Sequence, residues 1–267
     1  MDPSTVLFDL DGTLTEPRGP IASDVVKALK KLSKVSAIGI VTGSNIEYVR
    51  EQCLKELLQA EPHLSEEIAF YPCNGTQEWV WYQEDSVFEI SYANNMRKQL
   101  GEESFRDLLI MLLDWQSKLS KGWKELPLSG TFVQYRDSMV NWCPIGRVAT
   151  QEQRNKFKEL DMETGFRAKI INNLRKDIDG MCIGVVVAKG GDTSFDIYPV
   201  GWDKTFVLGR INSDETWFVG DRCTGDGNDR HLYEALPHNR RFSTTGPKNT
   251  IEIINAIIRD IKDSDRP

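Results

Sequence analysis

The sequence predicts an α/β protein whose core is a parallel sheet, with an inserted α+β domain that carries an antiparallel sheet. Short apolar runs alternate with amphipathic helical stretches at both ends of the chain, which is typical of parallel strands and crossover helices. The middle of the chain instead holds β-rich runs around the paired glycines Gly190 and Gly191, a hairpin signal. We therefore expect a core of residues 1–86 and 199–267 and an insertion of residues 87–198.

The individual elements follow from hydrophobic periodicity. Core strands are expected at short apolar runs, in residues 5–8, 37–41, 68–71 and 217–219. Core helices are expected where apolar residues recur every three or four positions, in residues 23–33, 45–59, 228–236 and 250–261. In the insertion we expect a long helix at 105–119, a strand pair within 131–142, a polar helical stretch at 150–177, and a hairpin of 182–187 and 194–198.

Composition excludes several classes of function. The 267 residues suffice for one large or two smaller domains. The 33 basic and 40 acidic residues give a net charge of −7, which argues against nucleic-acid binding. Five dispersed cysteines without a Cys-x-x-Cys pair indicate reduced thiols rather than disulfides or a zinc site. Because there is no signal-peptide pattern and no apolar run of membrane-spanning length, we expect a cytoplasmic protein with no membrane partner.

Two aspartates, Asp9 and Asp11, follow the first predicted strand directly. The carboxyl ends of strands in open α/β sheets are where such proteins bind ligands. Two carboxylates this close need a cation or a shared proton to relieve their repulsion, and a divalent metal is the expected remedy. Asp9 could then attack phosphorus while Asp11 exchanges a proton with a substrate oxygen. The alternative is a plain turn or a calcium loop, but the residues after Gly12 do not continue an EF-hand pattern.

Three further motifs suit phosphate chemistry. Ser44, in Thr42-Gly43-Ser44, ends the second strand where backbone N–H groups can hold phosphate oxygens, although a simple helix cap reads the same way. Lys204 could neutralise a phosphorylated aspartate, where the alternative is a solvated lysine at a helix start. Asp221 follows a predicted buried strand and offers the hard oxygen ligand that Mg²⁺ prefers, rather than belonging to a merely acidic loop.

The block Phe8-Asp9-Leu10-Asp11-Gly12-Thr13-Leu14-Thr15 resembles the first signature of the haloacid dehalogenase superfamily of phosphotransferases. In that superfamily the first aspartate forms an aspartyl-phosphate and the second is the general acid/base. The other three motifs follow in the superfamily's order. The resemblance implies a Rossmannoid catalytic core with an inserted cap domain, Asp9, Asp11 and Lys204 as catalytic residues, and Mg²⁺ held by Asp9, Asp11 and Asp221.

The inserted region is similar to that of the eukaryotic-type phosphomannomutase family. Three segments carry this resemblance: Thr131 to Arg136, Pro144-Ile145-Gly146-Arg147, and Ser194-Phe195-Asp196 with the following Gly201-Trp202-Asp203-Lys204. The resemblance implies that the distal phosphate of a hexose phosphate is held by Arg136, Arg147 and Arg154, that Ser194 and Asp196 contact the sugar or its phosphate, and that Arg18 reaches the substrate from the core.

This family resemblance also implies a reaction. The expected activity interconverts mannose 6-phosphate and mannose 1-phosphate for GDP-mannose synthesis, with a hexose 1,6-bisphosphate as activator and a homodimer formed through the cap. A sugar-phosphate phosphatase on the same scaffold and a binding protein without catalysis are the alternatives. Cys73 stands where a glutamate is expected, and residues 77–103 bear little family character. These departures leave the preference for mannose over glucose, and the balance of mutase over phosphatase, open.

Overall fold

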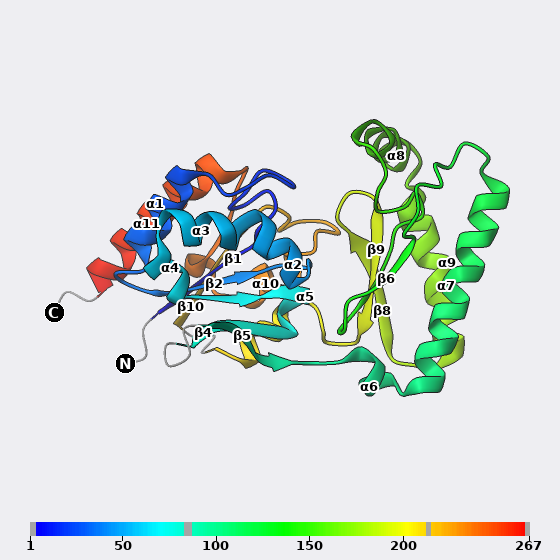
Figure 1. Cartoon of the computed structure of the whole chain (residues 1–267), viewed down its shortest axis with the longest axis horizontal. Coiled ribbons are helices and arrows are strands. Elements are labelled where there is room, and N and C mark those ends of the chain that lie inside the picture. Colours follow the sequence, from blue (N-terminus) through cyan, green and yellow to red (C-terminus); the bar gives the residue numbers. More distant parts are fainter. Residues whose placement is uncertain (1–3, 83–86, 212–214, 265–267) are drawn as a thin grey trace. The chain divides into compact units, whose positions relative to one another are not determined.

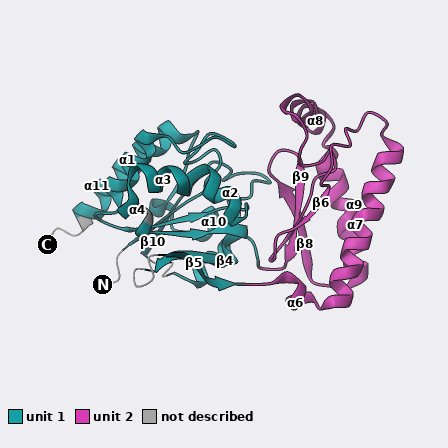
Figure 2. Ribbon diagram, in the orientation of Figure 1, with its two compact units in different colours: residues 1–93, 202–267 teal, residues 94–201 magenta. Residues whose placement is uncertain are grey.

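The computed structural model describes residues 4–82, 87–211 and 215–264. The chain forms two compact units, Met1–Ala93 with Trp202–Pro267 and Asn94–Gly201 (Figure 2). The domain boundary expected at residue 86 falls outside the described residues, so the expected domain limits stay a prediction. Within the described part of the chain, no helix combines the length and the apolar character needed to cross a membrane.

The first unit is built on a seven-stranded sheet (Figure 1). Five strands are parallel to their neighbours, and two more continue the sheet antiparallel at one edge. The spatial order is β11 (Arg241–Ser243), β10 (Thr216–Gly220), β1 (Thr5–Phe8), β2 (Ala37–Val41), β3 (Ile68–Tyr71), β4 (Gln77–Tyr82) and β5 (Val87–Ala93). The predicted strand at residues 5–8 is therefore an interior strand of the sheet, and its carboxyl end is flanked by β10 and β2.

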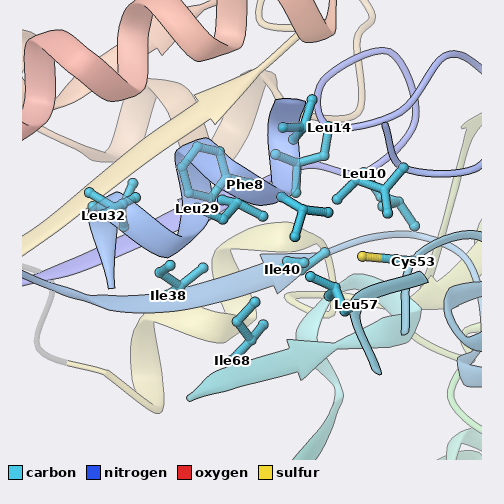
Figure 3. Packing of buried hydrophobic residues seen from close by; sticks show 14 of the residues in the cluster. Phe8, Leu10, Leu14, Leu29, Leu32, Ile38, Ile40, Cys53, Leu57 and Ile68 are labelled. Atoms are coloured by element: carbon cyan, nitrogen blue, oxygen red, sulfur yellow. The ribbon is translucent and has the colours of Figure 1, made fainter. Parts of the chain in front are cut away.

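Alternation along β1 distributes its side chains to two apolar clusters. Val6 and Phe8 pack with α1 (Ser23–Leu32) and α11 (Pro247–Ser264) on one face of the sheet. Figure 3 shows Phe8 in this cluster with Leu29 and Leu32 of α1. Leu7 points to the other face, where Val207 and Leu232 come from a 3₁₀ helix (Lys204–Gly209) and α10 (Arg230–Ala235). Burial on both faces explains why this strand reads as a continuous apolar run rather than an alternating one.

The expected helix at residues 45–59 is not a single regular helix. It consists of α2 (Ile46–Val49), a π-helical turn (Arg50–Leu54) and α3 (Lys55–Ala60), and the short α4 (Pro62–Glu66) follows. The apolar period survives the irregular turn, because Val49, Cys53 and Leu57 all remain fully buried. A further short helical segment, α5 (Pro72–Gly75), follows β3 and contains Cys73 and Asn74 with positive φ.

The hairpin of β4 and β5 was not predicted by hydrophobic pattern. It extends the core sheet beyond β3, so residues 77–82 and 87–93 belong to the first unit. Aromatic packing holds it there: Trp79 stacks on Phe88 at 5.9 Å between ring centroids, and Arg50 lies over the Trp79 ring at 5.1 Å. The side chains of these strands are mostly half-buried, which is why the segment lacks a clear strand signature.

The second unit holds a separate four-stranded antiparallel sheet, which together with the parallel core confirms the predicted fold class. Its strand order is β6 (Val133–Tyr135), β7 (Val140–Trp142), β9 (Ser194–Pro199) and β8 (Val185–Gly190). Its helices are α6 (Met96–Leu100), α7 (Glu102–Gly122), α8 (Gln151–Thr164) and α9 (Phe166–Met181). The expected helical stretch at 150–177 is thus two helices, because Gly165 between them adopts a left-handed conformation with φ of 63°.

Candidate active site

Asp9 lies immediately after β1, and its carboxyl group is paired with a buried lysine. The backbone N–H of Asp9 donates to the carbonyl of Val219 on β10 at 3.0 Å, which continues the sheet pairing by one residue. Lys204 donates from Nζ to Asp9 Oδ1 and, at 2.5 Å, to Asp229 Oδ1. Lys204 is 1% exposed and begins the 3₁₀ helix that Asp203 caps through the Thr205 N–H. The lysine is therefore held between two carboxylates inside the core.

Asp229 is a site residue that sequence reasoning did not assign. It is fully buried, and its second oxygen accepts a hydrogen bond from the Arg222 N–H at 3.0 Å. Its only signal in the sequence is the acidic loop Gly225-Asp226-Gly227-Asn228-Asp229, in which nothing favours Asp229 over Asp226 as a site residue. The structure favours Asp229, because it contacts Lys204. Each carboxyl group of Asp9, Asp221 and Asp229 offers one oxygen, and these oxygens all lie within 4.8 Å of one another.

Two glycines allow these carboxyl groups to come together. Gly12 has a φ of +82°, and a Cβ placed on it would lie 2.3 Å from Asp221 Oδ2. A Cβ on Gly220, at the end of β10, would lie 2.8 Å from Asp229 Oδ2. Real Cβ atoms do not approach oxygen that closely, so any other residue at position 12 or 220 would collide with these carboxyl groups. Gly12 is also needed because its positive φ disfavours other residues.

The electrostatics of this cluster favour the binding of a cation. Burial raises the pKa of Asp9 well above its ordinary value, Asp229 raises it further, and Lys204 opposes the shift. Burial and the neighbouring Asp229 raise the pKa of Asp221 to about 6, against the opposing effect of Arg222. Burial lowers the pKa of Lys204, but the two carboxylates outweigh it, so the pKa lies above its usual value and the lysine stays charged. One lysine does not balance three carboxylates.

The residues present fit a divalent metal ion. Asp221 Oδ1 is buried and has no hydrogen-bond partner among the described residues, which is costly for a carboxylate oxygen unless a cation satisfies it. Oxygen donors of this kind suit Mg²⁺. Of the three expected metal ligands, the structure brings Asp9 and Asp221 together and adds Asp229. The carboxyl group of Asp11 is not part of this group, and its role as a ligand stays a prediction.

The carboxyl group of Asp11 is instead held by two donors. Its Oδ1 accepts the backbone N–H of Arg18 at 2.9 Å and the phenol of Tyr48 at 3.0 Å. Burial and the nearby Asp11 raise the pKa of Tyr48 above its ordinary value, so the phenol keeps its proton and donates. Arg18 itself is exposed and has a positive φ of 64°. Tyr48 was not predicted from the sequence, where it reads as one residue of an amphipathic helix.

The loop that contains Ser44 is linked to the loop after β3. The Ser44 N–H donates to Thr42 Oγ1 at 3.1 Å, and the Cys73 N–H donates to the Ser44 carbonyl at 2.8 Å. The Asn74 N–H donates to the Thr42 carbonyl at 2.8 Å, so the two loops form one unit. Cys73, which stands where a glutamate was expected, is buried in this pair of loops. The binding of phosphate by Ser44 stays a prediction.

In the second unit, three of the predicted substrate residues meet at Asn141 on β7. The Asn141 amide donates to Ser194 Oγ at 3.0 Å and to Asp196 Oδ1 at 2.7 Å, and its oxygen accepts from Arg147 Nη1 at 2.9 Å. Sequence reasoning missed Asn141, because nothing in the order of residues marks it apart from its neighbours. The amide is the point where the segments around Arg147 and Ser194 are joined.

Arg136 and Arg154 are placed differently from Arg147. The guanidinium of Arg154 is buried and donates to the Ala149 carbonyl at 3.2 Å, to Thr193 Oγ1 at 2.9 Å and to the Arg147 carbonyl at 2.6 Å. Arg136 is also buried, and its Nε donates to Gln134 Oε1 at 3.3 Å. Arg154 thereby supports the backbone of Arg147. Binding of a phosphate by these arginines stays a prediction.

The family model and the curated relatives agree on one family. The family model described as eukaryotic phosphomannomutase matches residues 25–260. Phosphomannomutase 2 of Dictyostelium discoideum is 33% identical over 256 residues, covering 93% of this chain and 94% of that protein. The phosphomannomutase of Saccharomyces cerevisiae is 34% identical over 259 residues, covering 94% of this chain and 93% of that protein. A solved haloacid dehalogenase-like hydrolase from Bacteroides thetaiotaomicron aligns with a TM-score of 0.58 at 14% identity, covering 96% of this chain and 100% of that one, which confirms the predicted fold.

Proposed function

We propose that this chain, which belongs to the eukaryotic phosphomannomutase family, interconverts mannose 6-phosphate and mannose 1-phosphate through an aspartyl-phosphate at Asp9. A phosphomannomutase is an isomerase, because it moves a phosphoryl group within one sugar. The observation that carries this proposal is the buried pairing of Asp9 with Lys204 beside Asp221 and Asp229. A nucleophilic carboxylate needs its charge offset when it approaches a phosphate dianion, and a buried lysine does this without adding a competing nucleophile.

The chemistry assigns one role to each carboxyl group. An Asp9 oxygen attacks the phosphorus of the bound ester, and the departing sugar oxygen takes a proton from Asp11. In the second half-reaction Asp11 accepts the proton of the sugar hydroxyl that attacks the phosphoryl group on Asp9. A bound Mg²⁺, with Asp9 and Asp221 among its ligands, would supply positive charge to the phosphoryl oxygens. Lys204 holds Asp9 in place throughout.

The mutase reaction also sets a requirement on substrate binding. The hexose 1,6-bisphosphate must present each of its phosphates to Asp9 in turn, so another group has to hold whichever phosphate is not reacting. We propose that Arg136, Arg147 and Arg154 hold that phosphate and that Ser194 and Asp196 contact the sugar or its phosphate. Guanidinium groups suit the task because they bind phosphate bidentately and stay charged. Arg18 and Ser44 are the proposed contacts from the first unit.

One experiment tests this function against its alternatives. The protein is incubated with mannose 1-phosphate and Mg²⁺, with and without glucose 1,6-bisphosphate, and followed by ³¹P NMR. We expect mannose 6-phosphate to appear in a bisphosphate-dependent manner, and Asp9→Asn to abolish its formation. Inorganic phosphate as the main product would contradict the mutase and indicate a sugar-phosphate phosphatase. An unchanged spectrum would indicate a binding protein without catalysis. Repeating the reaction with glucose 1-phosphate decides the preference between the two sugars.

The remaining expectations rest on the family resemblance. A homodimer formed through the second unit, a cytoplasmic location, and the supply of mannose 1-phosphate for GDP-mannose synthesis stay predictions. Two exposed apolar side chains on α7, Ile110 at 50% and Leu113 at 58%, support a contact surface on that helix. The molecular mass of the protein in solution, compared with that of a variant carrying Leu113→Glu, tests the dimer.

A further inference from the structure

We propose that Asn141 is a positioning residue for the substrate, because its amide group fixes Arg147, Ser194 and Asp196 relative to one another. This inference rests on the proposed function, in which those three residues bind the hexose phosphate. It adds a residue that touches no reacting atom itself, and it makes the binding geometry of the second unit depend on one buried amide.

The first support is the place of Asn141 in the sheet. Asn141 on β7 is directly opposite Asp196 on β9, so both side chains stand on the same face of the sheet. The side chain of Arg147 reaches the same point from the loop after β7. Asn141 is 2% exposed, so its polar atoms depend on protein partners rather than on water.

The second support is the chemistry of an amide. Its NH₂ group donates to Asp196 Oδ1 at 2.7 Å and to Ser194 Oγ at 3.0 Å, while its oxygen accepts from Arg147 Nη1 at 2.9 Å. A side chain that satisfies an anion on one side and a cation on the other must offer both a donor and an acceptor. A carboxylate would attract Arg147 but repel Asp196, and an aliphatic side chain would satisfy neither. The amide therefore holds the carboxylate of Asp196 and the guanidinium of Arg147 in place at the same time.

The third support is that the partners are held from their other sides. Ser194 Oγ donates to the Gly190 carbonyl at 3.1 Å. The carboxyl group of Asp196 packs against Gly190, where a Cβ would come within 2.7 Å of it. Arg154 donates to the carbonyl of Arg147 at 2.6 Å. Asn141 thus links two segments that are each also held from another side, and its loss would remove the hydrogen bonds that connect Arg147 with Asp196 and Ser194 through this amide.

Binding and chemistry can be measured separately to test this. In the Asp9→Asn background, which prevents turnover, calorimetric titration with mannose 1-phosphate gives the dissociation constant. We expect Asn141→Leu to weaken binding on the order of tenfold, as the loss of hydrogen bonds to charged groups does. With Asp9 intact, hydrolysis of p-nitrophenyl phosphate by Asn141→Leu should stay within about twofold of the parent, because that small ester does not depend on the second unit. Asn172→Leu, at an exposed position on α9, is the matched control and should change neither quantity.

A double-mutant cycle distinguishes positioning from general damage. If Asn141 acts in part through Arg147, Asn141→Leu should weaken binding of mannose 1-phosphate clearly less in the Arg147→Ala background than in the parent, because only its effect through Ser194 and Asp196 remains. Losses that multiply would overturn the proposal, and so would equal losses in binding and in hydrolysis of the small ester. If Asn141→Leu does not fold, Asn141→Ser replaces it, because a hydroxyl is too short to bridge both charges. Failure of the proposed function would appear separately, as the absence of mannose 6-phosphate from the reaction of the unaltered protein.

Discussion

Tyr48 is the side chain in contact with the carboxyl group expected to exchange protons with the sugar. Two hydrogen bonds reach the same oxygen of Asp11, one from the Tyr48 phenol at 3.0 Å and one from the Arg18 N–H at 2.9 Å. An oxygen that accepts two donors is poorly suited to carry a proton of its own. The arrangement directs the other oxygen of Asp11 to the substrate.

Tyr48→Phe should therefore impair the step that needs Asp11 more than the step that needs only Asp9. We expect turnover of mannose 1-phosphate to fall about tenfold, the usual effect of losing one hydrogen bond to a charged group. The first-turnover release of p-nitrophenol from p-nitrophenyl phosphate should change less than twofold, because its leaving group needs no protonation. The steady-state rate with mannose 1-phosphate and the rapid-mixing burst of p-nitrophenol give the comparison. An equal decrease in both would show that Tyr48 only supports the fold.

At the level of single residues, the sequence predicts those site members that stand at strand ends and misses those chosen by tertiary contact. Asp9 and Asp221 each follow an apolar strand, which makes them recognisable. Asp229 and Asn141 are defined by partners 25 and 55 residues away, Lys204 and Asp196 respectively. Periodicity carries no information about such pairings, so these residues emerge only when the packing is known.

At the level of elements, the strands that are buried on both faces of the sheet are predicted better than the helices. The runs expected at 37–41 and 68–71 match β2 and β3 in full, because strands buried on both faces leave a continuous apolar signal. The helix expected at 45–59 contains a π-helical turn, and the stretch at 150–177 breaks at Gly165. Both interruptions preserve the apolar period on either side. Periodicity alone therefore cannot locate them.

The turn after β1 shows how an element constrains the site. Gly12→Ala should strain a backbone φ of +82° and push a Cβ toward Asp221 Oδ2, 2.3 Å away. We expect a loss of unfolding free energy of more than about 1 kcal/mol and weaker binding of Mg²⁺, since the displaced carboxyl group is a proposed ligand. Urea denaturation and calorimetric titration with Mg²⁺ measure the two effects.

Gly180→Ala is the matched control for this substitution. Gly180 is in α9, where a Cβ meets nothing within 4 Å, so alanine should leave stability unchanged or raise it by up to about 1 kcal/mol. If Gly12→Ala behaved like Gly180→Ala, the close approach of Asp221 to this turn would not matter for stability or for the site.

At the level of the whole molecule, the two units divide the proposed work. The first unit holds the carboxylates and Lys204, on loops that follow parallel strands. The second unit holds the residues that Asn141 joins, on an antiparallel sheet with its own apolar cluster. Because each group of residues is fixed within its own unit, a substitution in the second unit should impair phosphate recognition without impairing phosphoryl transfer to Asp9.

The stability of the first unit should depend on pH and Mg²⁺ together. Burial and Asp229 raise the pKa of Asp221 to about 6 from 3.8, so in the absence of metal the folded state binds more protons than the unfolded state between these values. Stability of the metal-free protein should therefore fall as pH rises through this window. Mg²⁺ binds only the deprotonated carboxylate, so it opposes this loss and competes with the proton at acidic pH.

Thermal unfolding at pH 5 and at pH 7.5, with and without Mg²⁺, measures this coupling. With Mg²⁺ at about 100 times its dissociation constant, we expect Tm to rise by about 5 to 10 °C at pH 7.5 and clearly less at pH 5. Asp221→Asn should remove most of the Mg²⁺ effect at both pH values, because a neutral amide neither repels Asp229 nor binds the cation strongly. An equal rise at both pH values would contradict the assignment of Asp221 as a ligand, since a carboxyl group half-protonated near pH 6 must release its proton before it can hold the metal.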